Sequence, residues 1–300
     1  MAVHVTNGPS SFQDSWRDLR AIRNDQQEEF INSLNVSQYL WEDKAQEFIE
    51  NFKTWLKGSR LNDFSALDKY PHASITCGTA QSFDHWYLKH HRKFIRVNEG
   101  EFMYHQASTK RTGMVIHRWD GPLLEGRDSC ILSMPFSGTG FVHKCYDRWL
   151  NEANLDDIPM MLDFCHAPTS RHLVLHDREC IKEINFSVSK AFWGGEWLRV
   201  GVRFSREEYD DGIDILNDNE IQMINRLGVG VANELIQKYE FDYPWLTYEN
   251  AYNEVCKRLN LVPTDNIMFA MGGEEYKDFE RAGKNRICLS EEIYRCLGSR

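Results

Sequence analysis

The stretch Asn185-Phe186-Ser187-Val188-Ser189-Lys190, followed by Trp197-Leu198-Arg199-Val200-Gly201, joins two apolar runs through a lysine and small hydroxyl side chains. Its pattern predicts that Lys190 follows the end of one strand and that Arg199 begins another. A lysine held in such a cleft loses its proton readily and can form a Schiff base with a carbonyl group. Most lysines are instead solvated on the surface. Taken alone, the stretch leaves both interpretations open.

Short apolar runs alternate with helical patterns on both sides of this stretch. The expected strands are 73–76, 93–97, 113–117, 130–134, 159–163, 183–187 and 198–204, and the expected helices between them include 79–90 and 141–151. Such alternation is typical of an α/β domain with a mainly parallel sheet and helices on both faces.

The two ends of the chain have a different pattern. A helix is expected at 38–57, with one buried stripe formed by Trp41, Ala45, Phe48, Ile49, Phe52, Trp55 and Leu56. After the turn at 210–212, two helices are expected near 218–239 and 247–260, then strands at 267–271 and 286–289 and a terminal helix. We therefore predict an N-terminal helical segment (1–59), a large α/β domain (60–240) and a smaller α+β C-terminal domain (241–300).

Composition excludes several classes of protein. The 300 residues are 42% hydrophobic and 27% charged, with a formal net charge of −10, and they contain no long run of basic residues. Nucleic acid and membrane are therefore not expected as partners, and the uncharged stretch 129–143 is too short to span a bilayer. The eight cysteines form no CxxC pair and the N-terminus has no signal-peptide pattern, so a cytoplasmic protein with reduced thiols is expected. The eleven histidines form no recognisable ligand set, so no metal site is expected.

Two other strand ends carry polar residues, and in open α/β sheets ligands bind at the carboxyl ends of strands. Gly78 and Thr79 lead from a strand into a helix, whose free N–H groups attract phosphate, although such turns are also common in loops. Asp163 ends an apolar strand and His166 follows it, so both side chains could lie over one ligand. The alternative is a helix-capping aspartate beside a partly buried histidine.

Taken together and in this order, these segments resemble the class I/II aminotransferase superfamily of enzymes that use pyridoxal 5'-phosphate (PLP), known as fold type I. The resemblance extends from about residue 73 to 290, and its most specific part is the S-x-S-K…L-R-x-G pattern formed by 187–190 and 198–201. It implies a PLP-dependent transferase-like fold. The implied cofactor-binding residues are Gly78, Thr79, Phe102, Tyr104, Ser137, Asp163, His166, Ser187, Ser189, Lys190 and Arg199.

The resemblance also implies individual roles. Lys190 would form the Schiff base with PLP and move the substrate's α-proton, and Asp163 would keep the pyridine nitrogen protonated. Gly78, Thr79, Ser187 and Arg199 would hold the phosphate, and Phe102 or Tyr104 would stack on the ring. Arg286 would grip the substrate carboxylate.

Four features depart from the family pattern. Ser137 stands where the family has an asparagine, and His166 stands where it has a tyrosine that contacts the cofactor's phenolic oxygen. The spacing from Lys190 to Arg199 is one residue longer than usual, and the chain is shorter than most members. Trp193, in the lengthened loop, either lines the mouth of the site, favouring an apolar substrate, or packs structurally.

We therefore expect an aminotransferase that moves an amino group between an amino acid and a 2-oxo acid, with Lys190, Asp163 and His166 as catalytic residues. In this family the site usually lies between two subunits, which implies a homodimer. Two alternatives stay open. One is another PLP reaction on the same fold, such as α-oxoamine synthase-like acyl transfer, lyase, aldolase or decarboxylase chemistry. The other is a non-catalytic member that acts as a binding module.

Overall fold

A seven-stranded sheet forms the centre of the computed structural model, which describes residues 16–298 except 18, 119–126 and 219. Its strand order is β1-β7-β6-β5-β4-β2-β3. The bounds are β1 (His72–Thr76), β2 (Phe94–Val97), β3 (Ile116–Arg118), β4 (Asp128–Ser133), β5 (Met160–Phe164), β6 (Ile181–Ser187) and β7 (Gly201–Ser205). The strands from β3 to β6 pair in parallel, whereas β7 runs antiparallel to both β1 and β6. The expected mainly parallel sheet is therefore confirmed, and each of the seven expected strands overlaps one of its strands.

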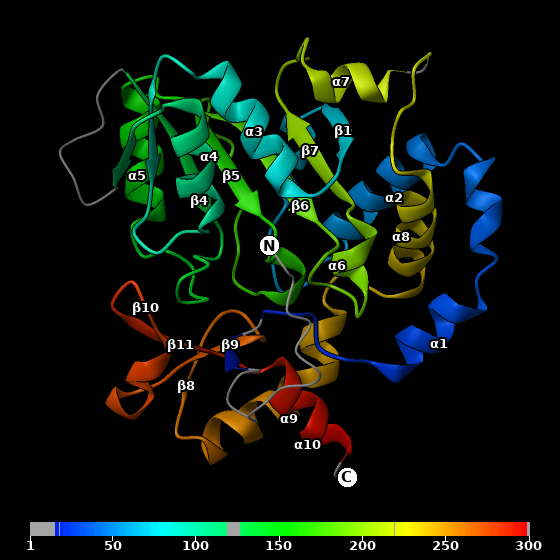
Figure 1. The fold of residues 1–300 in the computed structure, drawn as a ribbon, viewed down its shortest axis with the longest axis vertical. Coiled ribbons are helices and arrows are strands. Elements are labelled where there is room, and N and C mark those ends of the chain that lie inside the picture. Colours follow the sequence, from blue (N-terminus) through cyan, green and yellow to red (C-terminus); the bar gives the residue numbers. More distant parts are fainter. Residues whose placement is uncertain (1–15, 18, 119–126, 219, 299–300) are drawn as a thin grey trace, which may run out of the picture.

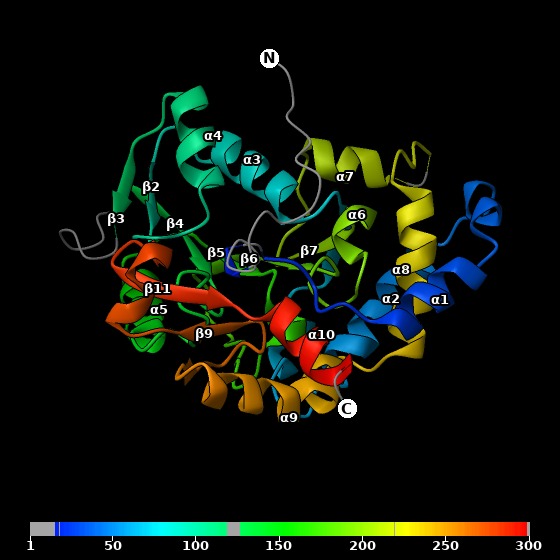
Figure 2. The ribbon, with the colours of Figure 1, turned by 60° about the horizontal axis from the view of Figure 1, so that its bottom comes forward.

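Helices cover both faces of this sheet (Figures 1 and 2). One face carries α2 (Ala45–Lys57), α5 (Tyr146–Leu155) and α8 (Arg226–Lys238), and the other carries α3 (Thr79–Lys89), α4 (Tyr104–Thr112) and α7 (Gly212–Asn217). Side chains alternate between the two layers because successive residues of a strand point to opposite faces. Leu132 belongs to the cluster on the α2 side, and its neighbour Ile131 to the cluster on the α3 side.

The N-terminal helices are arranged differently from the expected single helix at 38–57. The chain forms α1 (Asp25–Ser33), a 3-10 turn η2 (Val36–Leu40) and then α2, which begins only at Ala45. Phe48, Phe52, Trp55 and Leu56 are buried as expected, but Trp41 is 84% exposed. The prediction for Trp41 was wrong because this residue ends the 3-10 turn and does not continue the α2 stripe.

A four-stranded antiparallel sheet of order β10-β11-β9-β8 forms the C-terminal part. Its elements are α9 (Tyr243–Arg258), β8 (Val262–Pro263), β9 (Phe269–Met271), β10 (Glu280–Arg281), β11 (Lys284–Cys288) and α10 (Ser290–Gly298). The core of this part also contains Trp16 and Ile22 from the beginning of the described chain. The remaining short elements are η3 (Ser65–Lys69), η4 (Ala167–Thr169), α6 (Gly195–Leu198) and η5 (Glu274–Phe279). The domain boundaries at residues 59 and 240 stay predictions.

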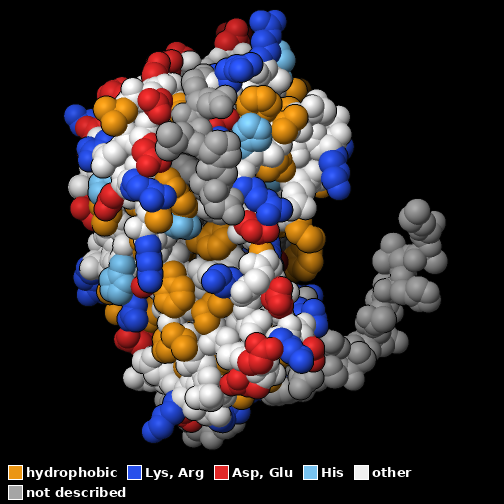
Figure 3. All heavy atoms as spheres, turned by 90° about the vertical axis from the view of Figure 1, so that its left-hand side faces the viewer, with side chains coloured by type: hydrophobic (Ala, Val, Ile, Leu, Met, Phe, Trp, Pro, Cys, Tyr) orange, Lys and Arg blue, Asp and Glu red, His pale blue; other side chains and the backbone are white. Residues whose placement is uncertain are grey.

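The surface has a mixed charge. Acidic and basic side chains are interspersed on the face shown in Figure 3, in keeping with the formal net charge of −10. Within the described residues, no helix has both the length and the apolar composition needed to cross a membrane.

Candidate active site

Polar residues meet at one edge of the large sheet, where the parallel strands end. Across this edge Gly201 pairs with both Thr76 and Ser187, and Ser133 pairs with Asp163. The edge faces the four-stranded sheet (Figure 1). The carboxyl ends of parallel strands are the usual ligand-binding position in open α/β sheets, so the fold brings the expected residues together there.

The turn before α3 forms a compact cradle. Gly78 has φ +85°, and a Cβ at this residue would lie 3.0 Å from Nη2 of Arg199. That Nη2 donates a hydrogen bond to the carbonyl of Cys77 at 2.9 Å. Gly201 permits the close approach, since its own Cβ would lie 3.2 Å from Cα of Gly78 and 2.6 Å from the carbonyl of Phe186. The start of α3, with Thr79, therefore lies beside a guanidinium, which is a suitable site for an anion.

The lysine segment follows β6 directly. The hydroxyl oxygens of Ser187 and Ser189 are 2.6 Å apart, and Ser187 also donates to the carbonyl of Val200 at 3.2 Å. Nζ of Lys190 donates to the carbonyl of Leu19 at 3.0 Å. Burial lowers the pKa of His166, which follows the neighbouring strand β5, and the positive charge of Lys190 lowers it further. Lys190 is thus half-buried inside the site and is not a solvated surface lysine.

Asp163 ends β5 and is buried. Its Oδ1 accepts a hydrogen bond from the amide of Cys165 at 3.0 Å, and its Oδ2 lies 3.4 Å from the hydroxyl of Ser133. Burial raises the pKa of this carboxyl to about 7, and the neighbouring carboxylate of Glu101 adds to that effect.

His166 and Arg286 both pack against the ring of Phe269. The imidazole packs edge-on against Phe269 at 5.4 Å, and the guanidinium lies 4.5 Å over the same ring. Burial holds the pKa of His166 well below its usual range, and the charges of Lys190, Arg286 and Arg281 lower it further. Arg286 donates to the carbonyl of Ser137. Nδ1 of His166 and Nε of Arg286 are buried with no hydrogen-bond partner among the described residues, so both can still bind a ligand.

The aromatic residues named from the sequence lie in less central positions. Phe102 is 48% exposed, and its ring stacks on that of Tyr104 at 6.0 Å. The hydroxyl of Tyr104 donates to Asp84 on α3 at 2.5 Å. Trp193 is half-buried, and its backbone N–H donates to Oε1 of Gln27 at 2.8 Å. Ser137 contacts the site through Glu101, to which its hydroxyl donates at 3.2 Å.

Sequence reasoning missed three polar residues of the site. Glu101 comes from the loop before α4 and Arg281 from β10, and only the tertiary structure brings them together: Arg281 donates to the backbone carbonyl of Glu101 at 3.3 Å. Cys165 lies between Asp163 and the start of α3, and burial raises its pKa to about 12, so its thiol is neutral. Its position two residues after Asp163 was a signal that could have identified it.

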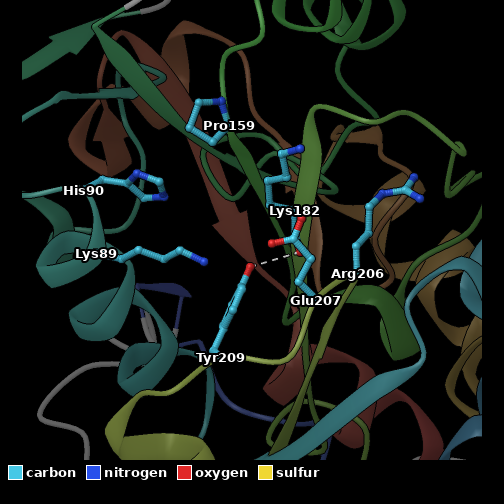
Figure 4. A pocket seen from close by; sticks show the side chains of 7 residues that line it. All are labelled: Lys89, His90, Pro159, Lys182, Arg206, Glu207 and Tyr209. Atoms are coloured by element: carbon cyan, nitrogen blue, oxygen red, sulfur yellow. Dashed lines mark hydrogen bonds between the residues drawn. The ribbon is translucent and has the colours of Figure 1, made fainter.

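A separate pocket lies away from this edge. It has a volume of about 160 Å³, and Figure 4 shows the residues that line it: Lys89, His90, Pro159, Lys182, Arg206, Glu207 and Tyr209. Pro159 precedes β5 and Lys182 is near the start of β6, so the pocket is at the amino ends of the strands. It is therefore not part of the candidate site. Within the described residues, no three side chains suited to metal binding are grouped together.

Comparisons with known proteins agree on the fold. No family model and no curated protein matches the chain. A tyrosine aminotransferase from Leishmania infantum matches with a TM-score of 0.67 and 12% identity over 98% of this chain and 100% of that one. An L-threonine-O-3-phosphate decarboxylase from Porphyromonas gingivalis matches at 0.62 and 13%, over 95% and 98% of the two chains. A PLP-bound C-S lyase from Staphylococcus hominis matches at 0.62 and 14%, over 84% and 81%.

These likenesses show that the chain has the fold of PLP-dependent fold-type-I enzymes, as expected. Because the matched proteins carry out different reactions at such low identity, the likeness shows the fold and not the reaction.

Proposed function

We propose that this protein is a PLP-dependent aminotransferase, which moves an amino group between an amino acid and a 2-oxo acid. The observation that carries the proposal is the meeting of Lys190, Asp163 and the Gly78–Arg199 cradle at one edge of the sheet. These groups arise from three strand ends, and each has the chemistry that one part of the cofactor requires.

The residues present fit this cofactor. The cradle of Gly78, Thr79 and Arg199 suits a phosphate, with Ser187 and Ser189 supplying further hydroxyl donors. Asp163, a buried carboxyl, suits a pyridine nitrogen, and the unpartnered Nδ1 of His166 suits the phenolic oxygen. When bound, PLP supplies an aldehyde that condenses with amines and a ring that accepts electrons from a carbanion.

The chain's own residues then bind the substrate and move its proton. Arg286 binds the substrate carboxylate, because its guanidinium is buried and Nε has no partner among the described residues. Nζ of Lys190 takes the α-proton in its neutral form and returns it as general acid. To do so, Nζ must leave the carbonyl of Leu19, which now accepts its hydrogen bond.

Transamination is preferred over the other PLP reactions because the S-x-S-K…L-R-x-G pattern is similar to that of aminotransferases. A C-S lyase and a decarboxylase have similar folds, so another PLP reaction is the second candidate. A homodimer and a cytoplasmic location belong to the same proposal and rest on the resemblance and on the cysteine pattern.

The experiment is a titration of the purified chain with PLP, followed by visible absorption before and after borohydride. We expect a band that borohydride bleaches and that Lys190→Ala lacks. Lys182→Ala, at the opposite edge of the sheet, is the matched control and should keep the band. Amino acids that remove the band and release 2-oxo acids would support transamination, and Lys190→Ala should slow turnover by about 10³-fold or more.

Other outcomes separate the alternatives. Release of carbon dioxide would indicate decarboxylation instead of transamination. Release of a thiol and ammonia together with a 2-oxo acid would indicate C–S bond cleavage. A folded chain that forms no band with added PLP would overturn the enzyme proposal and favour a non-catalytic binding module.

A further inference from the structure

Two buried carboxyl groups share one hydroxyl group in the candidate site. Glu101 lies in the loop between β2 and α4 and is only 7% exposed, as is Asp163. The hydroxyl of Ser133 is 2.8 Å from Oε2 of Glu101 and 3.4 Å from Oδ2 of Asp163. Nothing in the pattern of the sequence links these two acids, which are 62 residues apart.

The partners of this pair are neutral. Glu101 accepts from the hydroxyls of Ser133 and Ser137 and, at 3.4 Å, from the amide of Ser133 and the side chain of Asn98. The side chain of Asp163 accepts from the amide of Cys165, and its other polar contact among the described residues is the shared hydroxyl.

One charged neighbour acts on Glu101. Arg281 is half-buried and donates to the backbone carbonyl of Glu101 rather than to its carboxylate, and its positive charge also interacts with that carboxylate. Cys165 and Tyr87 are the titratable groups that face Asp163, and burial raises the pKa of both. The charge of Lys190 acts on Cys165 and His166.

Two carboxylates in one dry site cannot both ionise without a large cost, so the pair retains one proton near neutral pH. The acid with more hydrogen-bond donors keeps the charge, because donors stabilise the ionised form. The one hydroxyl proton of Ser133 belongs to the shorter contact, with Glu101. Glu101 then has four donors, and Asp163 has one, the amide of Cys165. We propose that Asp163 carries the proton of this pair in the ligand-free protein, and that Glu101 is the positioning residue whose charge holds it there.

The consequence rests on the proposed function. If a pyridine nitrogen binds at Asp163, the O–H bond of Asp163 breaks and an N–H bond forms, with no change in the number of protons. Asp163 would then be a carboxylate beside a positive N–H group. The charge of Glu101 would retain this proton between Asp163 and the nitrogen as pH rises, and the electron-accepting form of the ring needs that proton.

The test is a pH titration of the ligand-free full chain labelled with ¹³C at the aspartate side-chain carboxyls. Asp163→Asn assigns the resonance by its loss. Glu183, another buried acid whose pKa burial raises to about 7, stays silent because glutamate is not labelled. In the wild type we expect Asp163 to titrate near 7, far above the usual value of about 4 for this side chain.

Glu101→Gln keeps the shape of the side chain and removes its charge, so it should lower the Asp163 titration by on the order of one pH unit or more. The matched control is Glu99→Gln in the same loop, an exposed acid paired with Arg118, which should cause no shift. If Glu101→Gln does not fold, Glu101→Asp replaces it. That variant withdraws the carboxylate by one methylene and should also lower the titration.

Two results would overturn the proposal: a wild-type Asp163 that titrates near 4, or an unchanged titration in a folded Glu101 variant. Because PLP is absent from the titration, a failure here is distinct from a failure of the chain to bind PLP.

Discussion

Gly78 combines two constraints at one residue. Its φ of +85° is unfavourable for any residue with a Cβ, and a Cβ would also press on the guanidinium of Arg199. Gly113, with φ +70°, has the first constraint without the second, because nothing lies within 4 Å of its Cβ position. Alanine variants of the two glycines therefore distinguish the effect of backbone strain from the effect on the Gly78–Arg199 cradle.

We expect Gly78→Ala and Gly113→Ala each to lower the free energy of unfolding by about 1 to 2 kcal/mol. Only Gly78→Ala should weaken anion binding, because only there must Arg199 move. Denaturant unfolding measures the first effect, and the dissociation constant for inorganic phosphate or PLP measures the second. Equal affinity in the two variants would exclude Gly78 from the cradle.

At the scale of the element, α2 shows where an apolar stripe ends. Phe52 is fully buried between α2 and the sheet, where it contacts the rings of Phe48, Trp55, Phe186 and Phe204. Trp41 fits the same spacing in the sequence, but it lies outside the helix and is 84% exposed. The two aromatics therefore have the same apparent periodicity but very different burial.

Phe52→Ala should lower the free energy of unfolding by about 3 to 5 kcal/mol, since it leaves a cavity in a packed core. Trp41→Ala should change it by less than about 0.5 kcal/mol, as expected of an exposed site. Chemical denaturation of both variants checks this. A large loss in Trp41→Ala would mean that this face is covered in solution, for example by a second copy of the chain.

At the scale of the whole molecule, two kinds of buried titratable group make the stability of the fold depend on pH in opposite directions. Burial lowers the pKa of His90 to about 3 and of His105 and His143 to about 4. Below their unfolded value of about 6.5 the unfolded chain binds protons that the folded chain does not, so stability falls as pH falls from 6.5 towards 4. Burial raises the pKa of Asp163 and Glu183 to about 7. Here the folded chain binds more protons between the unfolded value of about 4 and the folded value of about 7, so this stability is lost as pH rises across that range.

The melting temperature of the ligand-free protein should therefore pass through a maximum between about pH 6 and 7. Asp163→Asn and Glu183→Gln each remove a group that loses stability between about pH 4 and 7, so each should steepen the rise on the acidic side and weaken the decline near pH 7. Thermal unfolding from pH 4 to 9 measures this. A stability that keeps rising to pH 9 in the wild type would contradict the buried, protonated state of these acids.

The sequence by itself determined the fold class and the local segments of the candidate site. Alternating apolar runs and helical patterns predict the large sheet, because a parallel strand buried on both faces must be apolar almost throughout. The lysine segment, the Gly78–Thr79 turn and Asp163 each lie at a strand end, and strand ends are local features that a sequence shows directly.

Only the tertiary structure decided which residues share the space around those segments. Glu101 reaches Ser133 and Ser137, and the carbonyl of Leu19 accepts from Lys190, through loops that have no periodicity to read. The pKa of Asp163 is raised because burial removes solvent from its carboxyl group and because the charge of Glu101 is close by. Such contacts join residues far apart in the chain, and their energies arise from packing and desolvation, so no local pattern of residues encodes them.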